Sequence, residues 1–371
     1  MARSVTRFHG ESRMLKFPHA ALLLALITAP LAAPPAWAQS VGAERIWPGC
    51  EAASAYSAAR RGLSVLVLHE GESVCETYAS GGGPDVAHEI WSGAKSFNGA
   101  LAAVAIHDGL ISSLDERVSD TITEWRSDPR RVHITIRQLL NLTSGVRSTV
   151  GRAPDYADAL TAPLTAEPGE RFQYGAAPFQ IFGALIQRKL AARGESGDAL
   201  SYLRQRLLDP LGMDSSAWRR TPAGDAMMSQ GAVFTARDWA RFGEFIRAGG
   251  RIDGALVVDE RAFREMFAGS DINPSYAVSW WTPRRSAAAA VVTAASDISA
   301  RADELPADLV MAAGAGDQRL YVIPSRGLTI VRQARFDVAA IREARSGRRR
   351  GAGDPWSDAD FVLLLLGEEA R

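Results

Sequence analysis

Strand-type segments occur near both ends of this chain, and a long stretch of helix-type sequence separates them. Close to the start, Leu63–His69 and Val74–Tyr78 are rich in β-branched residues and flank a short turn, which predicts a β-hairpin. The later segments with strand composition are Ala277–Trp281, Val291–Thr293, Arg319–Ile323 and Leu328–Gln333. Because strands need partners, this distribution predicts an α/β (α+β) fold, in which one sheet is assembled from the two ends of the chain around an inserted helical region.

Helical patterns fill the interval and also close the chain. Residues 49–62 form an Ala- and Arg-rich segment that ends at a glycine, and Ser92–His107 has helical apolar spacing with Ser92 at or just inside its N-terminus. The other expected helices are Ile136–Leu142, Pro178–Ala192, Leu200–Leu208, Ala236–Arg247 and Asp358–Glu369. We therefore divide the chain into an α/β sheet domain, residues 39–110 plus 270–371, and a mainly helical domain, residues 111–269.

Residues 1–38 have the composition of a secretory signal peptide. Basic residues precede the apolar run Ala20–Ala29, prolines follow it, and Ala36–Ala38 fits a small-x-small cleavage site. The run is too short to cross a bilayer, and the prolines argue against a buried helix. We expect a mature chain from about Gln39 that is periplasmic or secreted and has no stable membrane anchor after cleavage.

Charge and cysteine usage restrict the classes of partner. The 42 basic residues balance the 42 acidic ones, and the densest basic stretch, Arg342–Arg350, is followed by glycines typical of a solvated loop, so no nucleic-acid partner is predicted. Cys50 and Cys75 can form a disulfide after export, and two buried thiols agree equally well with the sequence. No metal-ligand spacing of cysteine or histidine occurs, so neither a metal nor a cofactor is expected. The oligomeric state stays open.

Ser92 and Lys95 are the residues with the strongest chemical implication. Three positions apart on a helix, their side chains lie on the same face and within reach of each other. A serine hydroxyl becomes a good nucleophile when a neighbouring base takes its proton, and lysine can act as that base when desolvation keeps it neutral. The chain has three lysines among 42 basic residues, and one of them is at this position. The spacing therefore indicates a serine nucleophile with a lysine partner.

Two further segments can complete such a site. Tyr174 follows a Pro-Gly turn and precedes a predicted helix, where a phenol can relay a proton if nearby Lys95 lowers its pKa. Residues 312–318 (AAGAGDQ) lead into a strand, and their small side chains permit a close approach of substrate to a backbone N–H. Taken alone, an aromatic residue before a helix is more often a packing residue, and the small residues indicate no more than a flexible connection.

In this order the three segments resemble the serine β-lactamase-like hydrolases, which include class C β-lactamases, D-alanyl-D-alanine carboxypeptidases, family VIII esterases and 6-aminohexanoate-dimer hydrolases. The similarity extends over most of the mature chain, in blocks such as HEIWSGAKSFNGALAAVAIHDG, PGERFQYGAAPFQIFGALI and GAGDQRLYVIP. The resemblance implies an antiparallel sheet flanked by helices. It also implies hydrolysis of a small-molecule ester or amide through an acyl-enzyme.

The resemblance assigns a role to each residue of the predicted site. Ser92 is the acylated nucleophile, Lys95 its base and Tyr174 the general acid/base. The backbone N–H groups of Ser92 and Ala315 form the oxyanion hole. Further substrate contacts by Trp281, Tyr276 and Gly314 agree with the resemblance, whereas the sequence around Trp281 and Tyr276 favours packing inside a strand.

Three positions depart from the pattern of that superfamily. Ala176 replaces the asparagine of the Tyr-x-Asn motif, Ala312 replaces a lysine or histidine, and Asp317 replaces a glycine. The first two losses remove an amide and a cation that would contact substrate. They favour an esterase or amidase over an efficient β-lactamase. They also keep open a catalytically idle penicillin-binding-like module that binds a cell-wall fragment or a peptide.

Overall fold

The two ends of the chain meet in one five-stranded antiparallel sheet with the strand order β2-β1-β9-β8-β7. The computed structural model describes residues 47–288, 296–337 and 356–368. The strands are β1 Gly62–His69, β2 Glu72–Tyr78, β7 Val310–Gly314, β8 Gln318–Ile323 and β9 Leu328–Ala334. The predicted fold class is therefore confirmed.

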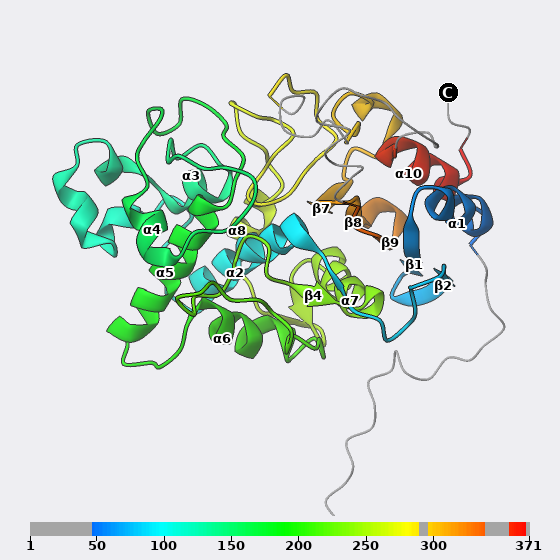
Figure 1. Ribbon diagram of the computed structural model, residues 1–371, viewed down its shortest axis with the longest axis horizontal. Helices are drawn as coiled ribbons and strands as arrows, with labels where there is room; N and C mark the ends of the chain where they lie inside the picture. The colour runs from blue at the N-terminus through cyan, green and yellow to red at the C-terminus, as the bar shows by residue number, and fades with distance from the viewer. Residues whose placement is uncertain (1–46, 289–295, 338–355, 369–371) are drawn as a thin grey trace, which may run out of the picture. The chain divides into compact units, whose positions relative to one another are not determined.

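Helices cover both faces of the sheet. Helices α1 (Cys50–Ala59) and α10 (Asp358–Leu366) pack together on one face, and α7 (Ala236–Arg247) packs on β8 and β9 from the other (Figure 1). Coverage on both sides explains why β8 and β9 are buried along their whole length. A Cβ atom at Gly243 of α7 would lie 2.4 Å from Thr329 Cγ2, so glycine permits this close approach.

The middle of the chain is helical, as predicted. The short turn η2 (Trp91–Lys95) continues directly into α2 (Ser96–His107), whose residues 96–105 are all buried. Such a helix has no solvent-exposed face over most of its length, which matches its Ala-rich composition. The other helical elements are η3 Val118–Asp120, η4 Thr123–Ser127, η5 Arg131–His133, α3 Ile136–Leu140, α4 Tyr156–Thr161, α5 Ala177–Ala192, α6 Ala199–Leu203, the π-helical turn η6 Arg204–Leu208, α8 Glu260–Glu265, η8 Ala302–Glu304 and η9 Pro324–Arg326.

Two short strand pairs complete the described elements. Strand β3 (His88–Glu89) pairs with β4 (Val233–Phe234), and β5 (Arg251–Ile252) pairs with β6 (Ala255–Leu256). The first pair brings the segment before η2 next to the segment before α7. Within the described residues no helix is long and apolar enough to cross a membrane.

Two local predictions were wrong, and one strand was missed. Residues 277–281 form a turn in place of a strand, with isolated bridges from Trp281 to Tyr276 and Met311, because Ser279 has φ +72° and turns the chain back. The helix expected from Ser92 begins as the 3-10 turn η2 and becomes α-helical only at Ser96. Strand β7 was missed because its Ala and Gly residues have a low strand preference.

Several predictions fall outside the described residues: the signal peptide (residues 1–38), the strand Val291–Thr293 and the basic stretch Arg342–Arg350. The division into a sheet domain and a helical domain stays a prediction, since the described residues belong to one compact unit. The open question about the cysteines is answered. Cys50 of α1 and Cys75 of β2 form a disulfide, with an S–S distance of 1.97 Å and a Cα–Cα distance of 5.6 Å.

Candidate active site

Ser92 lies at the start of the buried helical segment η2–α2. Its side chain is half-buried and so remains within reach of a substrate, whereas Gly93, Ala94 and Lys95 are buried. The preceding residue, Trp91, has φ +50°, a left-handed conformation that side chains larger than glycine rarely adopt. Such strained residues concentrate at functional sites, so the backbone marks this turn independently of the side chains.

Lys95 Nζ lies 3.0 Å from Ser92 Oγ and also donates a hydrogen bond to the Ser229 carbonyl oxygen at 3.1 Å. The lysine side chain is almost completely buried, with 3% exposed. Burial lowers the pKa of Lys95 from 10.5 to about 7, because an ammonium ion is poorly solvated there. Across residues 47–288, 296–337 and 356–368, no carboxylate forms an ion pair with this amine. Near neutral pH the Lys95 amine is therefore uncharged in a large fraction of the molecules and can accept a proton.

Asn98, one turn after Lys95, fixes the segment Met228–Ser229 that contacts the Lys95 amine. Its Nδ2 donates to the carbonyl oxygens of Lys95 at 3.0 Å and Met228 at 2.9 Å. The second bond fixes the chain immediately before Ser229, whose carbonyl accepts from Lys95. Neither Asn98 nor Ser229 is among the site residues predicted from the sequence. A single amide in an otherwise apolar helix was the signal for Asn98, whereas nothing in the sequence marks Ser229.

Tyr174 lies against the same pair, with Lys95 Nζ 4.9 Å from the centre of its ring. Burial raises the pKa of Tyr174 to about 12, although a hydrogen bond with Ser92 and the positive charge of Arg319 act in the opposite direction. Lys95 is not among the groups that lower the pKa of this phenol. An amine with a pKa of about 7 is neutral at the higher pH where a phenol ionises, so it adds no positive charge there, and desolvation of the phenolate dominates. Tyr174 is thus a phenol at neutral pH and a proton donor.

Aromatic rings surround Tyr174. The ring centres of Tyr276 and Trp281 lie 6.0 and 5.9 Å from it, and Phe172 lies 5.3 Å from Tyr276. Tyr276 and Trp281 are 1% and 3% exposed, so in this conformation they present almost no surface to a substrate. Their direct effect is to fix the position of the Tyr174 ring, and substrate contact by either residue stays a prediction.

The end of β7 closes the site from the sheet side. A Cβ atom at Gly314 would lie 1.9 Å from the Ile90 carbonyl oxygen, so this position requires glycine. The next residue, Ala315, is exposed. The close packing of Gly314 on the segment before Ser92 places the two predicted oxyanion donors, the N–H groups of Ser92 and Ala315, on neighbouring segments. Their role in stabilising an oxyanion stays a prediction.

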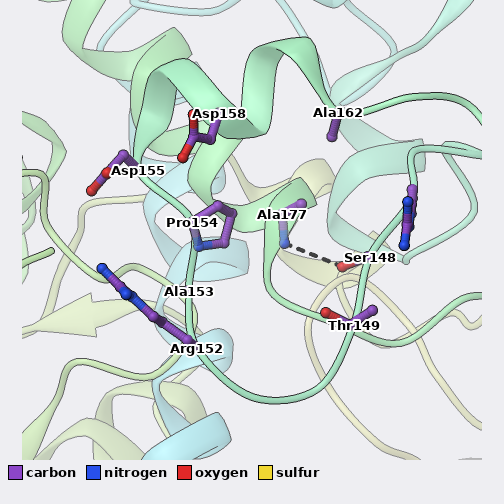
Figure 2. Close-up of a pocket in the computed structure, with 10 residues that line it drawn as sticks. Ser148, Thr149, Arg152, Ala153, Pro154, Asp155, Asp158, Ala162 and Ala177 are labelled. Atoms are coloured by element: carbon purple, nitrogen blue, oxygen red, sulfur yellow. Dashed lines mark hydrogen bonds between the residues drawn. The ribbon is translucent and has the colours of Figure 1, made fainter.

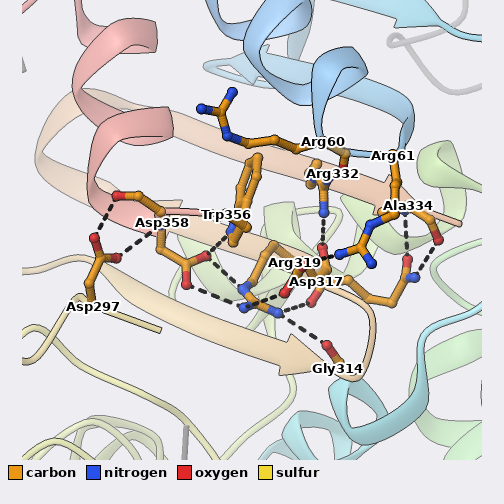
Figure 3. A network of polar contacts seen from close by, with 12 residues as sticks. Arg60, Arg61, Asp297, Gly314, Asp317, Arg319, Arg332, Ala334, Trp356 and Asp358 are labelled. Atoms are coloured by element: carbon orange, nitrogen blue, oxygen red, sulfur yellow. Dashed lines mark hydrogen bonds and ion pairs between the residues drawn. The ribbon is translucent and has the colours of Figure 1, made fainter. Parts of the chain in front are cut away.

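A buried ionic network holds the β7–β8 turn from behind (Figure 3). Arg319 on β8 donates to the Gly314 carbonyl oxygen at 3.1 Å and to the Asp358 carboxylate at 2.6 Å. Tyr321 and Trp356 also donate to Asp358, which keeps this carboxylate fully hydrogen-bonded. The strand that carries Gly314 is thereby attached to α10.

The network also explains why an aspartate occupies position 317. Asp317 has φ +61°, a conformation that usually requires glycine and that aspartate tolerates better than most residues. Its carboxylate forms ion pairs with Arg61 at 3.0 Å and Arg319 at 3.6 Å. The two remaining departures from the superfamily pattern, Ala176 and Ala312, are buried methyl groups that supply neither an amide nor a cation.

A cavity of about 480 Å³ opens near the N-terminus of α5 (Figure 2). The loop 147–155, α4 and Ala177 line it, and the Ala177 N–H donates to Ser148 Oγ at 3.2 Å. Arg147 and Arg152 are balanced by Asp155 and Asp158, so the lining favours neither sign of charge. The cavity therefore lies close in sequence to Tyr174 without including any of the three candidate catalytic side chains.

Comparison with known structures finds the same fold in several proteins. A protein from Bacteroides dorei assigned as a β-lactamase is 18% identical, with a TM-score of 0.67 over 86% of this chain and 98% of the other. A protein from Bacillus anthracis assigned as a 6-aminohexanoate-dimer hydrolase is 19% identical, with a TM-score of 0.61 over 79% of each chain. EstCE1, a hydrolase with promiscuous acyltransferase activity, is 15% identical, with a TM-score of 0.60 over 86% of this chain and 96% of its own.

At these identities the structural matches establish the fold alone, and no curated protein sequence matches the chain. The family model described as Beta-lactamase, however, matches residues 48–345, which is most of the chain. This range contains Ser92, Lys95, Tyr174 and the β7–β8 turn. On this match the chain belongs to the Beta-lactamase family of serine hydrolases.

Proposed function

We propose that this protein hydrolyses a small-molecule ester or amide through an acyl-enzyme on Ser92. The observation that carries the proposal is the 3.0 Å contact between Ser92 Oγ and a buried Lys95 whose pKa is lowered to about 7. Ser92 attacks the substrate carbonyl carbon while its proton passes to Lys95 Nζ, and the N–H groups of Ser92 and Ala315 stabilise the oxyanion.

The second half of the reaction uses the same groups in reverse. The tetrahedral intermediate collapses, the bond to the leaving group breaks, and that group departs with a proton supplied through Tyr174 and Lys95. Water then attacks the acyl carbonyl carbon and gives up a proton to Lys95. The bond from this carbon to Ser92 Oγ breaks, Ser92 Oγ regains its proton from Lys95, and the acid is released. The high pKa of Tyr174 supports a role as a hydrogen-bonded phenol that donates a proton and regains it within one turnover.

An esterase or amidase agrees better with the site than an efficient β-lactamase. The methyl groups of Ala176 and Ala312 replace an amide and a cation that would contact the substrate, and the cation would pair with a substrate carboxylate. The Cys50–Cys75 disulfide supports an exported protein, because disulfides persist in oxidising compartments. We include a periplasmic or secreted location in the proposal on this ground.

A substrate panel tests the proposal. The mature protein and Ser92→Ala are assayed with short-chain p-nitrophenyl esters, short amides and nitrocefin. We expect ester turnover that depends on Ser92 and little cleavage of nitrocefin. Rapid nitrocefin hydrolysis would overturn the substrate preference. Absence of turnover and of covalent labelling by a fluorophosphonate would instead favour an idle binding module.

A further inference from the structure

Next to Ser92 an aromatic stack lies outside the proposed catalytic group. Phe336, just after β9, is 36% exposed although it is a large apolar residue. Its ring stacks on Trp91 with a centroid distance of 4.6 Å and an interplanar angle of 27°. Trp91 is half-buried and immediately precedes the nucleophile.

The stack lies next to both halves of the predicted reaction centre. Through Trp91 it is one residue from Ser92. On the other side, a Cβ atom at Gly316 would lie 3.0 Å from Phe336 Cδ, and Gly316 directly follows Ala315, the predicted second oxyanion donor. Phe336 therefore lies against the turn that carries one catalytic N–H, and its stacking partner precedes the other.

The Arg219 side chain restrains the Trp91 ring in the absence of substrate. The Arg219 guanidinium lies 4.8 Å from the centre of the Trp91 ring. Arg219 is itself held by an ion pair with Glu89 of β3 at 2.7 Å and by the Gln230 carbonyl oxygen at 3.0 Å. Because these contacts restrain Trp91, binding a flat group beside it requires little additional ordering. The Arg219 charge is already paired, so the exposed part of the stack offers an apolar, aromatic surface.

On this basis we propose that the Trp91–Phe336 stack is a substrate subsite that selects esters or amides with an aromatic group close to the scissile carbonyl. The inference rests on the proposed hydrolase function and narrows its substrate class. Aromatic rings gain from stacking beyond the burial of apolar area. The aromatic group can belong to the acyl part or to the leaving group, since both extend from the carbonyl carbon held between Ser92 and Ala315.

Three esters distinguish an aromatic acyl part from an aromatic leaving group. Ethyl phenylacetate carries the ring in the acyl part, benzyl acetate carries it in the leaving group, and ethyl acetate has no ring. For each, kcat/KM is measured with the wild type, Phe336→Ala, Phe336→Leu and Phe336→Tyr. The readout is the ratio of kcat/KM for an aromatic ester to kcat/KM for ethyl acetate, so intrinsic ester reactivity cancels between variants. Val86→Ala is the matched control, because Val86 is also an exposed apolar residue, with 41% exposed.

We expect that Phe336→Ala lowers the ratio for one aromatic ester by about tenfold, the size of a lost aromatic stacking contact. Phe336→Leu lowers it less, Phe336→Tyr preserves it, and Val86→Ala leaves it unchanged. The inference is overturned if Ser92-dependent turnover of ethyl acetate occurs while the ratio is the same in all variants. If no ester is hydrolysed and Ser92 is not labelled, the proposed function itself fails.

Discussion

Lys95 and Arg319 are both basic residues buried to the same extent, with 3% exposed, yet their surroundings differ in one respect. Arg319 has the Asp358 carboxylate at 2.6 Å, whereas the nearest polar groups of Lys95 are a hydroxyl and a carbonyl oxygen. Burial disfavours the charge of Arg319, but the charges of Asp358 and Asp317 together with the hydrogen bond to Asp358 outweigh it and raise the pKa above the ordinary arginine value. Burial without a counter-ion lowers the pKa of Lys95 to about 7.

Two equally buried basic residues in one fold therefore take different roles: Arg319 is a structural cation, and Lys95 is a candidate base. A paired guanidinium keeps its charge and can hold the β7–β8 turn permanently. An unpaired amine loses its charge near neutral pH and can accept the proton of Ser92. The counter-ion decides which of the two roles a buried cation takes.

The largest expected effect comes from making the base permanently charged. Lys95→Arg should lower kcat/KM for a p-nitrophenyl ester by about 10³-fold, because a guanidinium cannot accept the proton of Ser92. Lys189→Arg is the matched control, since Lys189 forms an ion pair with Glu116 at 2.6 Å and is predicted to have no catalytic role. Activity of Lys95→Arg within tenfold of the wild type would contradict the comparison.

Removing the counter-ion of Arg319 should give the next largest effect, on stability. Asp358→Asn removes the closer of the two carboxylates that pair with the buried Arg319 guanidinium and leaves only Asp317 at 3.6 Å, which costs about 3 kcal/mol in the free energy of unfolding. Urea unfolding measures this loss. The control is Glu124→Gln, which breaks the solvent-exposed pair with Arg188 and should cost at most about 1 kcal/mol. Equal losses in both variants would show that Arg319 does not depend on its counter-ion.

The pH dependence of stability distinguishes the two cations directly. The pKa of Lys95 is about 7 in the folded protein and 10.5 as its model value, so between these pH values the unfolded chain binds more protons at this position. Stability from this residue therefore rises with pH, by up to about 1.4 kcal/mol per pH unit. Lys95→Met should be more stable than the wild type at pH 7.5, and the difference should shrink by about 2–3 kcal/mol at pH 9.5. A constant difference would mean that Lys95 stays charged when folded.

The smallest effect is expected from the hydrogen bonds that assist the Arg319 pair. Tyr321→Phe removes the hydroxyl that donates to Asp358 and should cost about 2 kcal/mol in the free energy of unfolding, as for a hydrogen bond to a charged group. The ester hydrolysis rate of this variant at neutral pH should change little. A loss below about 0.5 kcal/mol would show that the carboxylate relies on Arg319 alone.

The catalytic pair, the strands and the buried ion pair differ in how far the sequence predicts them. The Ser92–Lys95 pair follows from a local spacing, and strands β1, β2, β8 and β9 follow from their β-branched composition. Strand β7 ends in Ala-Ala-Gly and forms because β8 offers it a hydrogen-bonding edge, so its own residues gave little signal. The Arg319–Asp358 pair joins residues 39 positions apart, and the Ser229 carbonyl reaches Lys95 across 134. Such contacts depend on tertiary packing, which no spacing rule encodes.

The most direct test of the central claim is the pH dependence of covalent labelling of Ser92. The rate of fluorophosphonate attachment is followed by mass spectrometry from pH 5 to 10, with Ser92→Ala as the blank. A Lys95 amine that is neutral above about pH 7 predicts a rate that rises with pH and reaches half its plateau near 7. A midpoint near 10, or labelling that persists in Ser92→Ala, would contradict the account.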